Sequence, residues 1–339
     1  MSASPSAVKP SERHDARAGS LGFVADIAVH DWLVLAYVVG LVLAVLQSEH
    51  GPAFGHNLER VLILLGSAVL GICVARGKWL RDGWLKGLLY RFAIYGPVQL
   101  SYFMFRDLLP AINPGSLDAE LHALDLALFG VEPAMALDRV VTSHTTEWFA
   151  FFYFGYFFVI AVHVVPILFF SRSQRLLAEF AFGMLILFCV GHTIYMLVPG
   201  FGPYRAMADQ FSTPFPHGLW LDLVMDTVHS GGAQKDIFPS LHTAAPAFIT
   251  LFSFRNRVHL PYRFTWPLTA LFTANIMIAT MFLRWHYLID VVAGLVLATT
   301  ASLLVRPVVD WELRRRADGR GSALWPLLIT PNRDAKADS

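Results

Sequence analysis

The chain alternates long apolar stretches with shorter polar segments, and several of these stretches have the length of a membrane-spanning helix. Such a helix needs about 20 mostly apolar residues, with a range of roughly 17–25. By this length rule the sequence predicts an all-α, polytopic membrane helix bundle of about eight transmembrane helices. The predicted spans are residues 30–47, 60–76, 84–104, 148–170, 176–198, 241–255, 264–284 and 287–305.

Two long connections and two polar tails complete the predicted organisation. The amphipathic stretch 117–129 is closed by Gly130, which predicts a helix at the membrane interface. The connection 199–240 is rich in Gly and Pro and is predicted to hold a short helix at 217–229. We therefore expect an N-terminal tail (1–29), a transmembrane domain (30–305) and a basic, partly disordered C-terminal tail (306–339).

The positions of Lys and Arg predict how the bundle is oriented. Cytoplasmic loops of membrane proteins carry an excess of these residues. With an N-terminus inside and eight spans, the inside segments hold 20 of the 26 Lys and Arg residues. Both termini are therefore predicted to be cytoplasmic, in a bacterial plasma membrane. The inside segments are 1–29, 76–91, 171–175, 255–263 and 306–339.

Composition supports the membrane class and excludes others. The chain is 55% hydrophobic and only 15% charged, whereas soluble domains carry about 25% charged residues. The formal net charge is +1, and no basic block with interleaved aromatic residues is present. We therefore expect no nucleic-acid partner. Only Cys73 and Cys189 occur, each within an apolar run, so a disulfide framework is excluded.

Two short segments place ionisable side chains at the ends of predicted spans. They are Phe238–His242 and Arg284–Asp290. Charged groups and imidazoles are costly at membrane depth and usually mark function there. His286 and Asp290 are four residues apart, which puts both on one face of a helix. A carboxylate that holds an imidazole can aim it as a nucleophile or a base.

The predicted topology brings these segments to the same, extracytoplasmic face. Arg205, Lys235 and Arg284 fall in the same connections, although the charge rule disfavours basic residues on this side. A positive cluster that defies the rule predicts a bound anion, most simply a phosphate. Ser240 and the backbone amides that start the helix after it add hydrogen-bond donors for that phosphate. His242 adds a second imidazole.

These motifs resemble those of the type-2 phosphatidic acid phosphatase superfamily. Phe238-Pro-Ser-Leu-His242 and His286-Tyr-Leu-Ile-Asp290-Val-Val-Ala-Gly294 are closest to the fungal inositol phosphorylceramide synthases and their bacterial relatives. The stretches Leu121-His-Ala-Leu-Asp-Leu-Ala-Leu-Phe-Gly130 and Tyr195-Met-Leu-Val-Pro-Gly-Phe-Gly-Pro-Tyr-Arg205 also resemble this branch. The resemblance covers roughly residues 115–300 and implies a six-helix, phosphatase-like catalytic core.

The resemblance implies a role for each matching residue. His286 would attack the phosphorus and carry a phosphohistidine-type intermediate, with Asp290 orienting its ring. His242 would protonate the departing oxygen and later deprotonate the acceptor, which is either water or a lipid hydroxyl. The implied activity is transfer of a phospholipid headgroup, with inositol phosphate transfer to a lipid alcohol favoured. No metal or other cofactor is implied.

Two departures from the superfamily pattern concern its basic residues. The first basic motif, Lys-x6-Arg-Pro, is absent, and Arg205 stands where it is expected. The phosphatases usually carry Arg six residues before the second histidine, where this chain has Thr280. Arg284 is the candidate replacement. These departures weaken the assignment as a plain phosphatase.

Alternatives to the headgroup transferase remain open on the sequence alone. One is a phosphatase acting on phosphatidate or a prenyl diphosphate. Another is a hydrolase that binds zinc through His242, His286 and Asp290. The third is a non-enzymatic lipid transporter with an anion site. All of them act on a lipid in a membrane, and the sequence leaves the oligomeric state undetermined.

Several other polar or aromatic residues are expected to be structural. Asp125 is expected to stabilise its own interfacial helix, and His163 to be a hydrogen-bonded core histidine. The aromatic run 148–158 is expected to face lipid and neighbouring helices.

Overall fold

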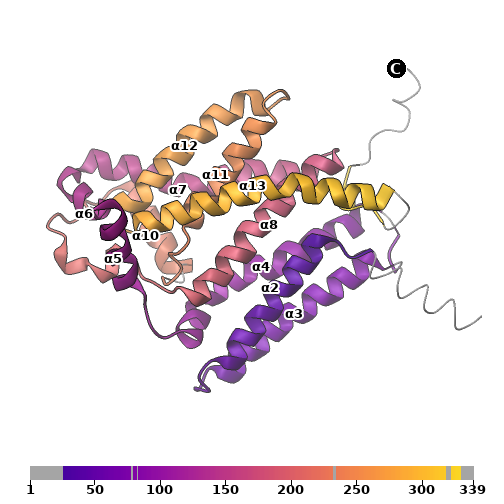
Figure 1. The fold of residues 1–339 in the computed structure, drawn as a ribbon, viewed down its shortest axis with the longest axis horizontal. Helices are drawn as coiled ribbons and strands as arrows, with labels where there is room; N and C mark the ends of the chain where they lie inside the picture. The colour runs from indigo at the N-terminus through magenta and orange to yellow at the C-terminus, as the bar shows by residue number, and fades with distance from the viewer. Residues whose placement is uncertain (1–25, 78, 82, 232–233, 318–321, 330–339) are drawn as a thin grey trace, which may run out of the picture.

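A computed structural model describes residues 26–77, 79–81, 83–231, 234–317 and 322–329, and these contain twelve α-helices and no strand (Figure 1). The all-α prediction is confirmed. The helices are α2 (Val29–Gln47), α3 (Phe54–Arg76), α4 (Trp84–Ile112), α5 (Asp118–Phe129), α6 (Pro133–Leu137), α7 (Ser143–Val165), α8 (Gln174–Leu197), α9 (Pro203–Ala206), α10 (Leu219–Gly231), α11 (Leu241–Arg255), α12 (Tyr262–Phe282) and α13 (Leu288–Ala317).

Six of the described helices are long and apolar enough to cross a membrane, so the chain is an integral membrane protein. They are α2, α3, α7 with the π-helical turn Pro166–Phe170, α8, α12 and α13. The other two predicted spans, α4 and α11, differ from these six. The 29 residues of α4 include Lys86, Arg91 and Arg106, and α11 has only 15 residues. Fifteen residues rise about 22 Å, less than the ~30 Å hydrocarbon core.

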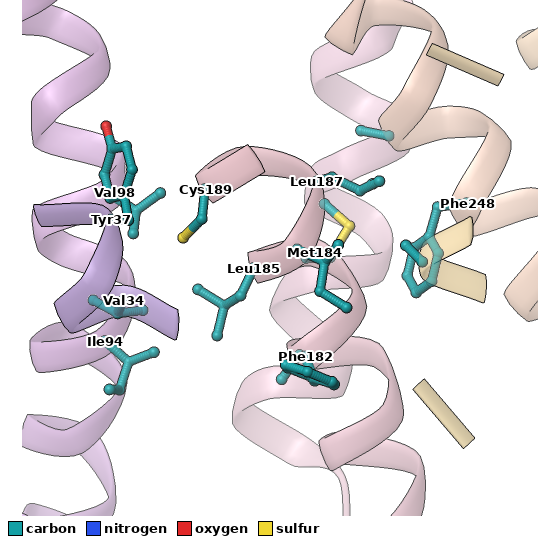
Figure 2. Packing of buried hydrophobic residues seen from close by; sticks show 14 of the residues in the cluster. Val34, Tyr37, Ile94, Val98, Phe182, Met184, Leu185, Leu187, Cys189 and Phe248 are labelled. Atoms are coloured by element: carbon teal, nitrogen blue, oxygen red, sulfur yellow. The ribbon is translucent and has the colours of Figure 1, made fainter. Parts of the chain in front are cut away.

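Helix α8 joins two groups of helices into one bundle. On one side it packs against α2 and α4, and on the other against α11 and α13. Figure 2 shows its buried side chains, including Leu185 and Leu187, between Val34 on one side and Phe248 of α11 on the other. A Cβ atom on Gly183 would lie 2.0 Å from the Phe248 ring. This close approach of α8 and α11 therefore requires glycine.

The predicted connecting helices are present. Helix α5 begins and ends within one residue of the predicted 117–129 stretch, and Gly130 follows it in the left-handed conformation with a φ of 71°. Helix α10 lies close to the predicted 217–229 helix. Both lie with α6 at the end of the bundle where α13 begins, at the left in Figure 1. We call this end the site end.

The chain closes the bundle at the opposite end. Helix α13 continues past the predicted end at residue 305, and residues 322–329 follow after a short stretch outside the described residues. Trp325 is fully buried and stacks on His30, with ring centroids 4.8 Å apart. Arg91 of α4 donates to the Pro326 carbonyl at 2.9 Å and to the Leu168 carbonyl. The part of the predicted C-terminal tail in residues 322–329 is therefore packed against the helices.

Candidate active site

His286 lies in the short connection between α12 and α13, and Asp290 lies in the first turn of α13. The His286 Nδ1 atom is 3.3 Å from Asp290 Oδ2, and both side chains are buried. The same carboxylate accepts the Tyr287 backbone N–H at 2.9 Å. The i, i+4 pairing predicted from the sequence is thus present. An imidazole that donates from Nδ1 to the carboxylate presents the lone pair of its Nε2 atom.

His242 lies in the first turn of α11, which Ser240 caps by accepting the Thr243 N–H at 3.3 Å. Its ring stacks on Tyr153 of α7, with centroids 4.4 Å apart and planes 16° apart. The His242 and His286 ring centroids are 6.3 Å apart. The two predicted histidines therefore share one site. The His242 Nε2 atom is buried and lacks a hydrogen-bond partner among the described residues, which leaves it available to a ligand.

Direct backbone contacts hold these two helix starts together. The Ser240 N–H donates to the Asp290 carbonyl at 3.0 Å. A Cβ atom on Gly294 would lie 2.5 Å from the Ser240 carbonyl oxygen. Glycine at this position therefore lets α13 approach the start of α11. The distance between the two imidazoles depends on this approach.

Arg205 is the predicted basic residue that the structure brings to the histidines. It lies in the short helix α9, is exposed, and places its guanidinium carbon 4.1 Å from the centre of the Phe201 ring. It lines the same cavity as His242 and His286. The turn before it requires Gly202, which has a φ of 79° and whose Cβ would lie 2.2 Å from the Trp285 carbonyl oxygen.

Lys235 and Arg284 bind other parts of the protein. The Lys235 ammonium is buried and donates to the carbonyls of Asn113, Pro114 and Gly115 at 2.6–3.2 Å. Arg284 donates to Asp138 at 2.8 Å and to the Thr213 carbonyl at 2.6 Å. Neither residue lines the cavity of the histidines. Their predicted phosphate contacts stay predictions, and their present contacts fix loops around the site.

Two aspartates of α5 hold the loops that carry the site. Asp125 accepts the N–H groups of Leu288 and Ile289, both at 2.7 Å, and so caps α13. Asp118 accepts the Gly202 N–H at 2.8 Å and the Tyr287 hydroxyl at 3.1 Å. The expectation that Asp125 stabilises its own helix is wrong. Its carboxylate satisfies the free N–H groups of another helix, a contact that sequence spacing does not reveal.

Replacing Asp125 with alanine is expected to lower kcat at least about tenfold, because a 1 Å misplacement near a reacting group costs up to ~10²-fold. The variant leaves the part-buried Leu288 and Ile289 N–H groups without these acceptors, and His286 lies just before them. Asp125→Asn keeps one acceptor oxygen and should fall between alanine and wild type. Steady-state kinetics per folded enzyme would measure this. The control is Glu120→Ala, an exposed change on the same helix. An unchanged kcat with only a lower Tm would contradict a positioning role.

Sequence reasoning missed three residues that border the histidines. Tyr153 and Tyr156 pack against His242, with ring centroids 4.4 and 4.2 Å away. Both tyrosines of the 148–158 run face a neighbouring helix, as expected, but they also line the cavity of the histidines. Asp236 lines the cavity and hydrogen-bonds to Tyr102. A single acid between Lys235 and a hydrophobic residue has no spacing that would have identified it.

Burial sets the protonation of the groups at the centre of the site. It lowers the pKa of His286 to about 4, although the nearby Asp236 and a backbone hydrogen bond act in the opposite direction. The imidazole is therefore neutral at pH 7, as a nucleophile must be. Burial also raises the pKa of Asp236.

A cavity of about 550 Å³ has both histidines in its wall. Its volume lies within the usual range of ligand sites, roughly 300–1,000 Å³. The walls between the polar residues are mostly aromatic and aliphatic side chains of α4, α7 and α8. The arrangement can therefore receive an apolar molecule that carries an anionic group.

Among the residues that the structure describes, no group of three or more His, Cys, Asp and Glu side chains is placed to hold a metal ion. The zinc hydrolase alternative, which required His242, His286 and Asp290 as ligands, therefore has no donor set in this part of the chain.

Comparison with known proteins places the site in a family. No curated protein matches the chain, and no solved structure matches it. A family model described as the PAP2 superfamily matches residues 119–304, which is more than half of the chain. The match includes both histidine motifs and, within α5, Asp125, which caps α13. With this match added to the paired histidines, the chain belongs to the PAP2 superfamily.

Proposed function

We propose that this protein is a lipid phosphotransferase that uses His286 as its nucleophile. Family membership supports phosphatase or phosphotransferase activity in general. The finer proposal rests on one observation: two imidazoles lie 6.3 Å apart at one cavity, and one of them contacts a buried carboxylate. This pairing supplies a nucleophile, a residue that orients it and a separate proton donor.

The proposed reaction has two steps. In the first, the Nε2 lone pair of His286 attacks the phosphorus of a phospholipid headgroup. The bond from phosphorus to the lipid oxygen breaks, and that oxygen takes a proton from His242. Burial lowers the pKa of His242 to about 3, so this step requires the bound phosphate anion to raise that pKa until the ring carries the proton. In the second, His242 takes the proton of an acceptor hydroxyl, whose oxygen attacks the phosphorus and displaces His286. Arg205 is proposed to contact the phosphate oxygens, and the Ser240 turn to add backbone donors.

We favour a lipid alcohol over water as the acceptor, with inositol phosphate as the transferred group. The apolar walls around the histidines support this choice, because they would hold a lipid and limit water. Hydrolysis of a phosphatidate or prenyl diphosphate is the alternative. The unequal distribution of Lys and Arg supports an extracytoplasmic site.

A direct assay separates these activities. The full chain would be purified in detergent and given phosphatidylinositol labelled in its phosphate, together with ceramide as the acceptor. The expected product is labelled inositol phosphate on the acceptor lipid. Labelled phosphatidate or a prenyl diphosphate would be offered in parallel, and release of free phosphate only from these would favour the hydrolase. Absence of product from every substrate, with lipid movement in vesicles retained by His286→Ala, would favour the transporter.

A further inference from the structure

The cavity below the histidines extends deep into the bundle. Its lining runs along α4 from Phe103 to Arg91, and along α7 and its π-helical turn from Tyr153 to Phe169. Twelve residues of helix span about 18 Å. One leaflet of the hydrocarbon core is about 15 Å thick, half of ~30 Å. The cavity is therefore about as deep as one leaflet and reaches Arg91, where the chain end closes the bundle.

Apart from Gln99, His192 and several tyrosines, the polar groups of the lining lie at the two ends of this cavity. His242, His286 and Asp236 lie at one end, and Arg91 lies at the other. Arg91 is bound to carbonyl groups, including that of Pro326. The wall between them consists largely of apolar and aromatic side chains, including Tyr95, Val98, Phe157, Ile160, Val164, Met184 and Phe188. Such a wall suits a hydrocarbon chain.

Three phenylalanines show where the cavity opens. Phe92 and Phe103 of α4 are 62% and 56% exposed, and Phe157 of α7 is 44% exposed, yet all three line the cavity. A lining side chain that is also exposed lies at an opening. These residues lie in the apolar part of the bundle, so the opening between α4 and α7 faces the bilayer. A lipid chain can enter there sideways.

Helix α10 covers the cavity at the site end. Its residues Val224, Thr227 and Val228 line the cavity, and α10 packs on α7. Arg106 of α4 donates to the His229 carbonyl, in the last turn of α10, at 3.2 Å. The guanidinium at the negative end of a helix stabilises this link. Arg205, His229 and Gln234 line the cavity and are exposed, so the cavity also opens at the site end. The opening between α4 and α7 is the apolar one and suits a long chain.

The volume limits what the cavity holds. At roughly 30 Å³ for each non-hydrogen atom, a volume of about 550 Å³ accommodates about 18 such atoms. This is enough for one long alkyl chain and far too little for a whole two-chain phospholipid. We propose that the cavity is a single-chain slot, which binds one alkyl chain of the phospholipid whose phosphate meets His286. A second chain stays in the bilayer, outside the α4–α7 opening.

The position of the phosphate at His286 rests on the proposed function, whereas the slot rests on the cavity. Binding of the chain is therefore measured without turnover. The probe is hexadecyl monophosphate with a photoreactive diazirine at the chain end, added to the full-length protein in lipid nanodiscs. After irradiation, peptide mass spectrometry should find the label near Arg91, Leu168 or Phe169. Unlabelled hexadecyl monophosphate should compete for it. His286→Ala should be labelled like wild type, because the alkyl chain binds without turnover. A failure of the proposed catalytic role of His286 would therefore not affect this test of the slot.

Two substitutions at different depths sharpen the test. Val98→Trp fills the slot about one turn below Tyr102, and Val164→Trp fills it nearer the far end. Each should reduce labelling by the hexadecyl probe at least about tenfold, because overpacking by a large ring costs that much or more. Labelling by an octyl probe should survive Val164→Trp and be lost with Val98→Trp. Leu100→Trp, on the exposed face of α4, is the matched control and should change neither.

Three results would overturn the proposal that the cavity is a single-chain slot. One is a hexadecyl label spread over lipid-facing residues such as Leu89 and Leu100. Another is an equal loss of octyl and hexadecyl labelling in both tryptophan variants. The third is labelling of the far end by both chains of a two-chain phosphatidate that carries a diazirine at the end of either chain.

Discussion

Replacing His286 with alanine is expected to reduce turnover at least about 10³-fold, because removing a covalent nucleophile costs 10³-fold or far more in enzymes that use one. The variant also removes the acceptor of the transferred phosphoryl group. Wild-type enzyme that is mixed with labelled phospholipid and quenched in alkali should therefore carry phosphate on His286. His286→Ala should carry none. The measurement is a rapid-quench assay followed by peptide mapping.

His163→Ala is the matched control for this prediction. His163 is a buried histidine of α7 whose Nδ1 atom lies 2.8 Å from the Val159 carbonyl oxygen, and it does not line the cavity. It should retain both turnover and labelling. If His286→Ala kept a substantial rate, or if label appeared on another residue, His286 would not be the nucleophile.

Replacing His242 with alanine is expected to lower the rate with a natural phospholipid by about 10²–10⁴-fold, the usual worth of a general acid or base. The loss should depend on the leaving group. A lipid alkoxide needs a proton as it departs, whereas a p-nitrophenolate does not. A p-nitrophenyl ester of the same alkyl phosphate should therefore restore much of the first step in His242→Ala. The burst of p-nitrophenol would measure it.

The stacked tyrosine provides the control for His242. Tyr153→Phe keeps a ring against the imidazole, at a centroid distance of 4.4 Å in the wild type, and should remain close to wild type with both substrates. An equal loss of rate for the natural and the activated substrate in His242→Ala would contradict the proton-donor role. It would instead indicate that the imidazole serves to bind or pack.

Both predictions concern residues that could be identified from the sequence, and the physical reason is local. Membrane depth makes a buried imidazole or carboxylate costly, so His242, His286 and Asp290 stood out against their apolar neighbours. The spacing of His286 and Asp290 predicted one face of a helix, whereas His286 lies in the connection just before α13. The structure places their side chains 3.3 Å apart.

The basic residues show where such reasoning fails. Arg205, Lys235 and Arg284 were grouped because all three lie in the same predicted connections. Only Arg205 lines the cavity of the histidines. Lys235 and Arg284 point to carbonyl and carboxylate groups of segments distant in sequence, near residues 113–115 and at Asp138. A charge pattern along the chain carries no information on which partner a long, flexible side chain reaches.

By itself, the sequence determined the class of this protein and the identity of its central histidines. The lengths of the apolar stretches and the composition are enough for that. The hydrocarbon core requires helices, and polar side chains are too costly there to be kept without a function. Only the tertiary structure decided that Asp125 caps α13, that Tyr153 stacks on His242, and that a cavity of about 550 Å³ lies beside them. These features arise where helices far apart in sequence come into contact. Which side chains meet there depends on how the helices pack, and this packing leaves no repeating pattern in the sequence from which the contacts could be predicted.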